Sequence, residues 1–140
     1  MNAVIYFSIS KDRNSKKVAE SVEGDLFELK PKGKIYHSTF MQMLMYGYKT
    51  TSNRNVSYVI DDIDFSKYDL ITLVSPVWAG RVCQYMRRYL ETLPFKDKEV
   101  VLVGTSKGGY SKYFASYKGI LDPSNKVLNE IMYVDGKKVN

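Results

Sequence analysis

Three runs rich in apolar residues limit what this chain can fold into. They lie at residues 3–8 (AVIYFS), 68–75 (YDLITLVS) and 99–105 (EVVLVGT). None of them alternates between apolar and polar residues, so each predicts a strand that is covered on both faces. Helix-like patterns separate these strands. Strands that alternate with helices predict βαβ units, and therefore a parallel sheet with helices on both faces.

Turn residues and spacing indicate the other elements. The helix after the first run is expected to begin at Asn14 or Ser15 and to end at Gly24, with an apolar inner stripe. Further elements are predicted as strands at 25–30 and 126–134, an amphipathic helix at 82–93 closed by Pro94, and shorter helical patterns at 40–48 and 113–117. No linker or repeat divides the series, so we expect one domain over residues 1–140, a three-layer α/β/α sandwich.

The composition is that of an ordinary globular domain. The 140 residues are 44% hydrophobic and 26% charged, which needs no metal or disulfide to build a core. The single cysteine cannot form an internal disulfide, and no apolar stretch approaches the roughly 20 residues that cross a bilayer. With no signal-peptide pattern at the start, the sequence predicts a cytoplasmic protein that does not contact a membrane.

The formal net charge is +6, and the basic residues are spread in small groups. No known nucleic-acid reader motif accompanies them, so we expect no nucleic-acid partner; an anionic cofactor or an acidic protein remains. His37 and Cys83 lack partners at metal-ligand or catalytic spacing, so we expect a surface or capping histidine and a buried or half-buried structural thiol. The sequence predicts no metal site and no catalytic nucleophile paired with a base.

Three loops of unusual composition follow the strongest strands, at 8–15, 75–80 and 105–110. In a parallel sheet, ligands bind at the carboxyl ends of the strands, where the strand order reverses. The first loop offers hydroxyls and a helix N-terminus, which suit a phosphate. The second carries the only tryptophan, and the third two glycines and a tyrosine. Each loop also has an interpretation without a ligand: the first would cap a helix, the second would carry a tryptophan folded back on a helix, and the third would be a tight turn. Neither a dinucleotide fingerprint nor a GK[ST] phosphate loop is present.

A planar aromatic ligand with a phosphate would satisfy all three loops, and at this point the chain resembles the flavodoxins. The segments that carry the resemblance are IYFSISKDRNSKKVAE, YDLITLVSPVWAGR and KEVVLVGTSKGGY. The resemblance implies FMN as the cofactor and a five-stranded parallel sheet of order 2-1-3-4-5. It also implies phosphate contacts from Ser8, Ser10, Arg13, Asn14 and Ser15, and flavin contacts from Pro76, Val77, Trp78, Ala79, Gly80, Thr105, Ser106, Gly108, Gly109 and Tyr110.

The chain departs from the family pattern at two places. Lys11, Asp12 and Arg13 stand where the family normally has a single glycine, so the phosphate loop is two residues longer. The chain also ends soon after its last predicted strand, so we expect the final helix of the family to be absent.

The resemblance implies an FMN-binding electron-transfer protein, because the sequence offers no acid–base apparatus of its own. Two alternatives stay open: a small FMN-dependent NAD(P)H:quinone-type reductase, and a flavodoxin-like module that has lost FMN. For the carrier we expect a redox protein partner. Lys11, Arg13, Arg81 and Lys107 on the three loops indicate either that this partner is acidic or that the site admits an anionic second ligand. We expect a monomer or a weak dimer.

Overall fold

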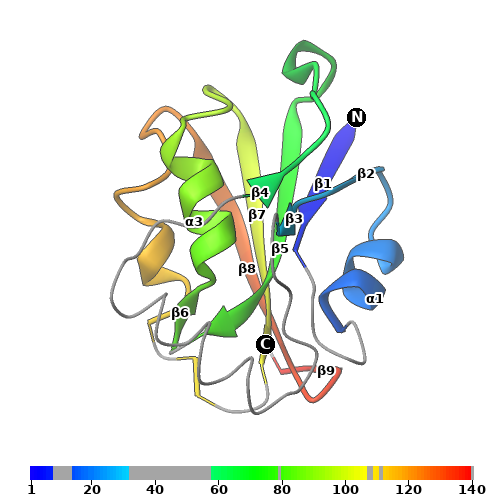
Figure 1. The fold of residues 1–140 in the computed structure, drawn as a ribbon, viewed down its shortest axis with the longest axis vertical. Coiled ribbons are helices and arrows are strands. Elements are labelled where there is room, and N and C mark those ends of the chain that lie inside the picture. The colour runs from blue at the N-terminus through cyan, green and yellow to red at the C-terminus, as the bar shows by residue number, and fades with distance from the viewer. Residues whose placement is uncertain (8–13, 32–57, 79, 107–108, 111, 140) are drawn as a thin grey trace.

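A computed structural model describes residues 1–7, 14–31, 58–78, 80–106, 109–110 and 112–139. Its main sheet contains five mutually parallel strands, which pair in the order β2-β1-β5-β7-β8 (Figure 1). Their bounds are Asn2–Tyr6 for β1, Asp25–Glu28 for β2, Leu70–Trp78 for β5, Glu99–Ser106 for β7 and Lys126–Val134 for β8. The three apolar-rich runs of the sequence thus become β1, β5 and β7 at the centre of the sheet.

Short antiparallel strands extend this sheet, so the expectation of five parallel strands in the order 2-1-3-4-5 was too simple. β6 (Arg81–Val82) pairs with the end of β5, and β9 (Lys137–Lys138) pairs with the end of β8. The sheet has seven strands, with the path β2-β1-β5-β7-β8-β9 and β6 beside β5. The physical reason is that Gly80 and Gly136 adopt positive φ values of 76° and 81°, which let the chain fold straight back.

A separate two-stranded sheet joins β3 (Lys30–Pro31) to β4 (Tyr58–Val59). Beyond β8, the described residues form a turn and β9. The helical pattern at 40–48 lies outside the described residues.

Helices cover both faces of the sheet (Figure 1). On one face, α1 (Asn14–Ser21) buries Val18 and Ala19 against Val4, Val74 and Val103. The other face carries α3 (Gln84–Glu91) and the 3-10 helix η2 (Ala115–Tyr117), and a second 3-10 helix, η1 (Phe65–Lys67), precedes β5. The predicted three-layer arrangement is therefore present in the described residues.

Burial on both sides explains why the central runs do not alternate. In β1, Val4 lies in the cluster under α1, whereas Ala3 and Ile5 lie in the cluster under α3, and all three are fully buried. A strand with solvent on one face would place polar residues at every second position.

The structure corrects several predicted boundaries: the strand predicted at 25–30 ends at Glu28, the first strand ends at Tyr6 rather than at residue 8, and α1 ends at Ser21 before Gly24. The strand predicted to stop before Pro76 continues to Trp78, with Pro76 paired to Thr105 of β7. Val74 O accepts a hydrogen bond from Phe7 N, so Val74 faces β1, and the nitrogen of Pro76, two residues on, faces the same side. β1 has already ended there, so the sheet needs no N–H group from Pro76. The helix predicted for 82–93 is shorter, because its first residue belongs to β6 and Leu93 has a φ of 53°.

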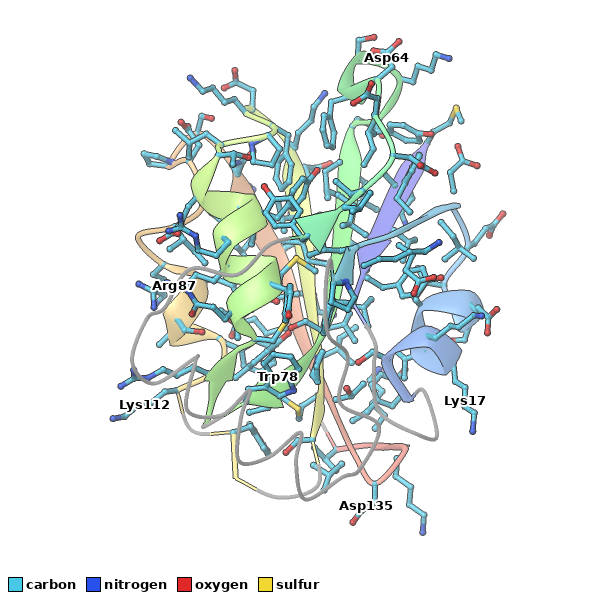
Figure 2. The ribbon with its side chains drawn as sticks, viewed as in Figure 1. Lys17, Asp64, Trp78, Arg87, Lys112 and Asp135 are labelled. Atoms are coloured by element: carbon cyan, nitrogen blue, oxygen red, sulfur yellow. The ribbon has the colours of Figure 1, made fainter. Side chains whose placement is uncertain are left out.

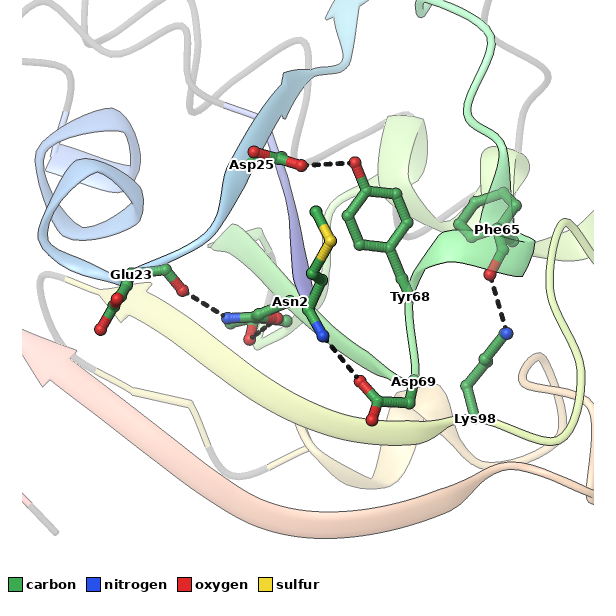
Figure 3. Close-up of polar contacts among 9 residues, drawn as sticks. Asn2, Glu23, Asp25, Phe65, Tyr68, Asp69 and Lys98 are labelled. Carbon is green, nitrogen blue, oxygen red and sulfur yellow. Dashed lines mark hydrogen bonds and ion pairs between the residues drawn. The ribbon is translucent and has the colours of Figure 1, made fainter.

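Polar contacts fasten the amino ends of the parallel strands to the segments beside them (Figure 3). Each joins groups far apart in the sequence: the Met1 ammonium and Asp69 Oδ1 at 3.1 Å, Asn2 Nδ2 and Glu23 O at 2.9 Å, Tyr68 Oη and Asp25 Oδ2 at 2.6 Å, and Lys98 Nζ and Phe65 O at 2.8 Å. These contacts belong to the end of the sheet opposite the predicted site. None of the helices in the described part of the chain is long and apolar enough to cross a membrane.

Gly104 in β7 tests the packing on the α3 face. A Cβ at this position would lie 2.7 Å from Tyr113 Cε2 and 2.6 Å from Met132 Cε, and the tyrosine ring is rigid. Gly104→Ala is therefore expected to lower the free energy of unfolding by about 1–3 kcal/mol through overpacking. Gly109→Ala is the matched control, since a Cβ added there would meet nothing within 4 Å. Urea unfolding measures both variants, and equal losses would contradict this account of the packing.

Candidate flavin site at the carboxyl edge of the sheet

The strand order reverses between β1 and β5. From β1 the chain passes through α1 to β2 on one side, whereas from β5 it passes through α3 to β7 on the other. The connections that follow β1 and β5 therefore leave the sheet in opposite directions, and a space lies between them at the carboxyl ends of the two strands. In sheets of this type, ligands bind in this space. The described parts of all three predicted loops lie at this edge.

The α1 side of the edge presents buried hydroxyls. Ser15, in the first turn of α1, is 2% exposed, and its Oγ lies 2.7 Å from Oγ1 of Thr105, which is 7% exposed. This hydrogen bond joins the predicted phosphate loop to the predicted flavin loop after β7, across 90 positions of sequence. Asn14 begins α1. The other predicted phosphate ligands, Ser8, Ser10 and Arg13, lie outside the described residues.

The β5 side presents apolar side chains. Pro76, Val77 and Trp78 are half-buried residues of the strand itself rather than of a loop. The Trp78 ring meets the rings of Phe7 and Tyr85 nearly edge-on, with centroids 5.5 Å and 6.0 Å away. Tyr85 belongs to α3, so the indole does lean on a helix, but part of it stays exposed toward the carboxyl edge (Figure 2).

The turn after β5 and the segment after β7 are joined by their backbones. Gly80 O accepts a hydrogen bond from Lys112 N at 3.2 Å, and Tyr110 O accepts one from Tyr113 N at 3.0 Å. Tyr110 is half-buried, and Ser106 O accepts from Asp135 N at 2.9 Å. Two more predicted flavin contacts, Ala79 and Gly108, lie outside the described residues. Gly109 is exposed with open space around it.

A buried hydroxyl network under this edge escaped the sequence analysis. Tyr113 Oη donates to Val103 O at 2.9 Å and lies 2.9 Å from Ser75 Oγ and 2.8 Å from Tyr117 Oη. It links the ends of β5 and β7 to the segment that carries Tyr110. The only sequence signal was the i, i+4 spacing of Tyr113 and Tyr117, which also suits plain core packing.

Burial keeps the acidic groups of this network protonated. It raises the pKa of Tyr113 and of Tyr117 well above that of a free tyrosine. It also raises the pKa of the Cys83 thiol to about 12, which fits the predicted structural role of this residue. Among the described residues, no cluster of histidine, cysteine or carboxylate side chains could hold a metal ion. The described edge offers hydroxyls, backbone groups and aromatic rings, which are groups that can contact a ligand.

The comparisons with known proteins identify the fold. No protein-family model matches the sequence, and no curated protein matches it. The structure is similar to that of a flavoprotein from Lactobacillus acidophilus crystallised in complex with FMN, with a TM-score of 0.75 and 23% identity over 96% of this chain and 93% of that chain. It is also similar to a proposed flavoprotein from Bacteroides eggerthii, with a TM-score of 0.72 and 20% identity over 94% of this chain and 86% of that chain.

A third neighbour, a proposed flavoprotein from Bacteroides uniformis, gives a TM-score of 0.68 and 21% identity over 96% of this chain and 92% of that chain. Likenesses of this kind establish the class of the fold. The chain has a flavodoxin-like α/β fold with a mostly parallel central sheet, as the sequence predicted.

Removal of one hydroxyl tests the buried network. Tyr113→Phe leaves Ser75 Oγ, Tyr117 Oη and Val103 O without this partner, so the free energy of unfolding is expected to fall by about 1–3 kcal/mol. Tyr133→Phe is the control, because the Tyr133 hydroxyl, half-buried on β8, makes no hydrogen bond to a described residue. Chemical denaturation of both variants measures the difference, and a neutral Tyr113→Phe variant would show that the network contributes nothing.

The raised pKa of Cys83 predicts how stability depends on pH. Between an ordinary pKa of 9.0 and about 12, the unfolded thiol loses its proton while the folded one keeps it. The unfolded state then binds fewer protons, so the free energy of unfolding falls as pH rises, by up to about 1.4 kcal/mol per pH unit for this group. Cys83→Ala is expected to flatten the profile just above pH 9. Urea titrations at several pH values measure the free energy of unfolding of both proteins. If it falls equally with pH in the two, the folded Cys83 thiol does not keep its proton and the prediction is wrong.

Proposed function

We propose that this chain binds FMN at the carboxyl edge of its sheet and serves as an electron-transfer protein. The observation that carries the proposal is the convergence of the α1 N-terminus with the ends of β5 and β7, at the point where the strand order reverses. The complex of the Lactobacillus acidophilus flavoprotein with FMN is consistent with it.

The α1 side suits the phosphate of FMN. The first turn of a helix leaves backbone N–H groups without intrahelical partners and carries partial positive charge. Beside these groups, the hydroxyls of Ser15 and Thr105 are buried and share one hydrogen bond. A hydroxyl can accept and donate at the same time, so the pair keeps one O–H donor that can turn toward a phosphate oxygen.

The β5 and β7 side suits a flat aromatic ring. Trp78 is held by edge contacts with Phe7 and Tyr85 and keeps part of its surface exposed. Gly80 and Gly109 have open space where a side chain would stand, so backbone can approach a ring closely at both positions. The hydroxyl network beneath holds these two segments in a fixed relation.

Bound FMN would supply one- and two-electron redox chemistry, and the protein would supply binding and orientation. With the thiol of Cys83 and the hydroxyls of Tyr113 and Tyr117 buried and protonated, none of them is poised to move a proton to a substrate at neutral pH. These observations favour a carrier, which exchanges electrons through its cofactor, over a self-sufficient reductase.

A comparison of FMN with riboflavin tests the phosphate site. Ser15→Ala is expected to weaken FMN binding by about tenfold or more, because a hydrogen bond to a charged group is lost. Riboflavin has no phosphate, so its affinity should change far less. Ser21→Ala is the control: its hydroxyl donates to Val18 O at the other end of the same helix. Isothermal titration of the three proteins measures the affinities, and equal losses for both flavins would contradict the assignment.

The cofactor assignment is tested first by the absorbance of the purified protein. A yellow protein, or a colourless one that takes up added FMN, supports flavin binding. A colourless protein that binds no FMN would instead identify a module that has lost its cofactor. Addition of NADPH without a reductase then separates the remaining functions, because bleaching of the flavin would identify a reductase and overturn the carrier.

A further inference from the structure

Basic side chains ring the carboxyl edge of the sheet. They come from four separate connections, namely the start of α1, the turn after β5, the segment before η2, and β9. We call this set the basic rim; it consists of Lys16, Lys17, Arg81, Lys112, Lys137 and Lys138. In the same connections the only acidic residue described is Asp135. Figure 2 shows Lys17, Lys112 and Asp135 at the same end of the molecule as Trp78.

The opposite end of the sheet has the reverse composition. The described connections at the amino ends of the strands carry more carboxylates than basic groups: Glu23, Asp25, Asp61, Asp62, Asp64, Asp69, Glu91, Asp97, Glu99 and Asp122, against Lys67, Lys96, Lys98, Lys118, Lys126, the Met1 ammonium, and Arg87 and Arg88, which are paired with Glu91. Charge is therefore separated along the strand direction. The charges of the described residues alone form a dipole whose positive end is the edge that contains the candidate site.

The rim charges are available to a partner. Lys17, Lys112, Lys137 and Lys138 are exposed, and no ion pair joins any rim residue to another residue in the described ranges. By contrast, Arg87 and Arg88 on α3 are both paired with Glu91. The neighbouring carboxylate at the end of β2, Glu28, is half-buried and accepts a hydrogen bond from Tyr6 Oη at 3.3 Å.

The rim surrounds side chains that are only half-buried. Trp78 ends β5, Tyr110 follows β7, and Val134 ends β8; each keeps part of its surface exposed. An apolar centre with charged residues around it is the usual composition of a transient protein–protein interface. Charge at the margin of such an interface mainly increases the association rate and orients the encounter.

We propose that the basic rim is the docking surface for an acidic protein. The inference rests on the proposed function only for the partner's role as a redox protein, because docking itself depends on the rim and the apolar centre. The dipole would turn the carboxyl edge, and with it the candidate flavin site, toward an acidic surface before contact.

The same observations disfavour a nucleic acid as the partner. The rim cations stand on four separate elements around an apolar centre, and they do not form a continuous strip that follows a backbone. A long polyanion would also extend past the edge toward the acidic amino end, whereas a compact acidic patch would not.

Trp78 provides a reporter within the proposed surface, because it is the only tryptophan in the chain. Its fluorescence is titrated with a poly-L-glutamate peptide and with an oligothymidylate of equal net charge, at low and at physiological ionic strength. We expect saturable binding of the peptide that weakens with salt. The double variant K17E/K112E should lose about tenfold in peptide affinity, since the rim loses half of its exposed cations.

The matched control is K96E/K126E, which changes the net charge equally but reverses two exposed lysines at the amino end. Its peptide affinity should stay within about twofold of the unaltered protein. Equal losses in the two double variants, no response of Trp78, or binding of the oligothymidylate at least as tight as that of the peptide would each overturn the proposal. Flavin content is measured separately by absorbance. A protein that binds the peptide but not FMN would refute the proposed function and leave the docking surface intact.

Discussion

Burial of β1, β5 and β7 on both faces is the constraint on which the rest of the structure depends. Val4 and Ile5 point to opposite sides of the sheet, and both are fully buried, so neither face can be left to water. Each parallel pair needs a connection long enough to return the chain to the same end, and a helix meets both needs at once. The position of α1 on one face and α3 on the other follows from this, and so does the reversal of strand order between β1 and β5.

That reversal brings distant parts of the chain together at one edge, and two hydrogen-bonded contacts fix their relation. Ser15 and Thr105 join the helix after β1 to the end of β7 at 2.7 Å. Below them, Tyr113 joins Val103 and Ser75. A buried hydroxyl without a hydrogen-bond partner costs free energy, so these contacts also favour one relative position of the segments that they join. The candidate site is therefore held from beneath by the core, while its upper surface keeps aromatic side chains and positive charge exposed.

The outer edge of the sheet differs from its centre, because no strand of the described residues pairs with the first part of β8 on that side. Val127 and Leu128 are 41% and 46% exposed there. Three features make this edge a poor template for another strand. Lys126 stands at its start, the register with β7 shifts at Leu128 as in a β-bulge, and the side chain of Asn129 accepts the N–H of Glu130 at 2.9 Å. β9 then covers the end of the strand through pairs with Tyr133 and Val134.

The sequence by itself determined the five strands that run parallel in the main sheet, because apolar runs and helical spacing are local signals. The edge at which a ligand binds stays a prediction. It predicted β8 with its exact observed bounds and the burial of Cys83. It did not show that β5 continues through Pro76, since that depends on where β1 ends beside it. Only the tertiary structure brought Ser15 to Thr105 and Tyr113 to Ser75. It alone revealed that charges scattered along the chain separate onto opposite ends of the sheet. Such contacts join positions far apart in the chain, and their energies depend on burial that no local pattern records.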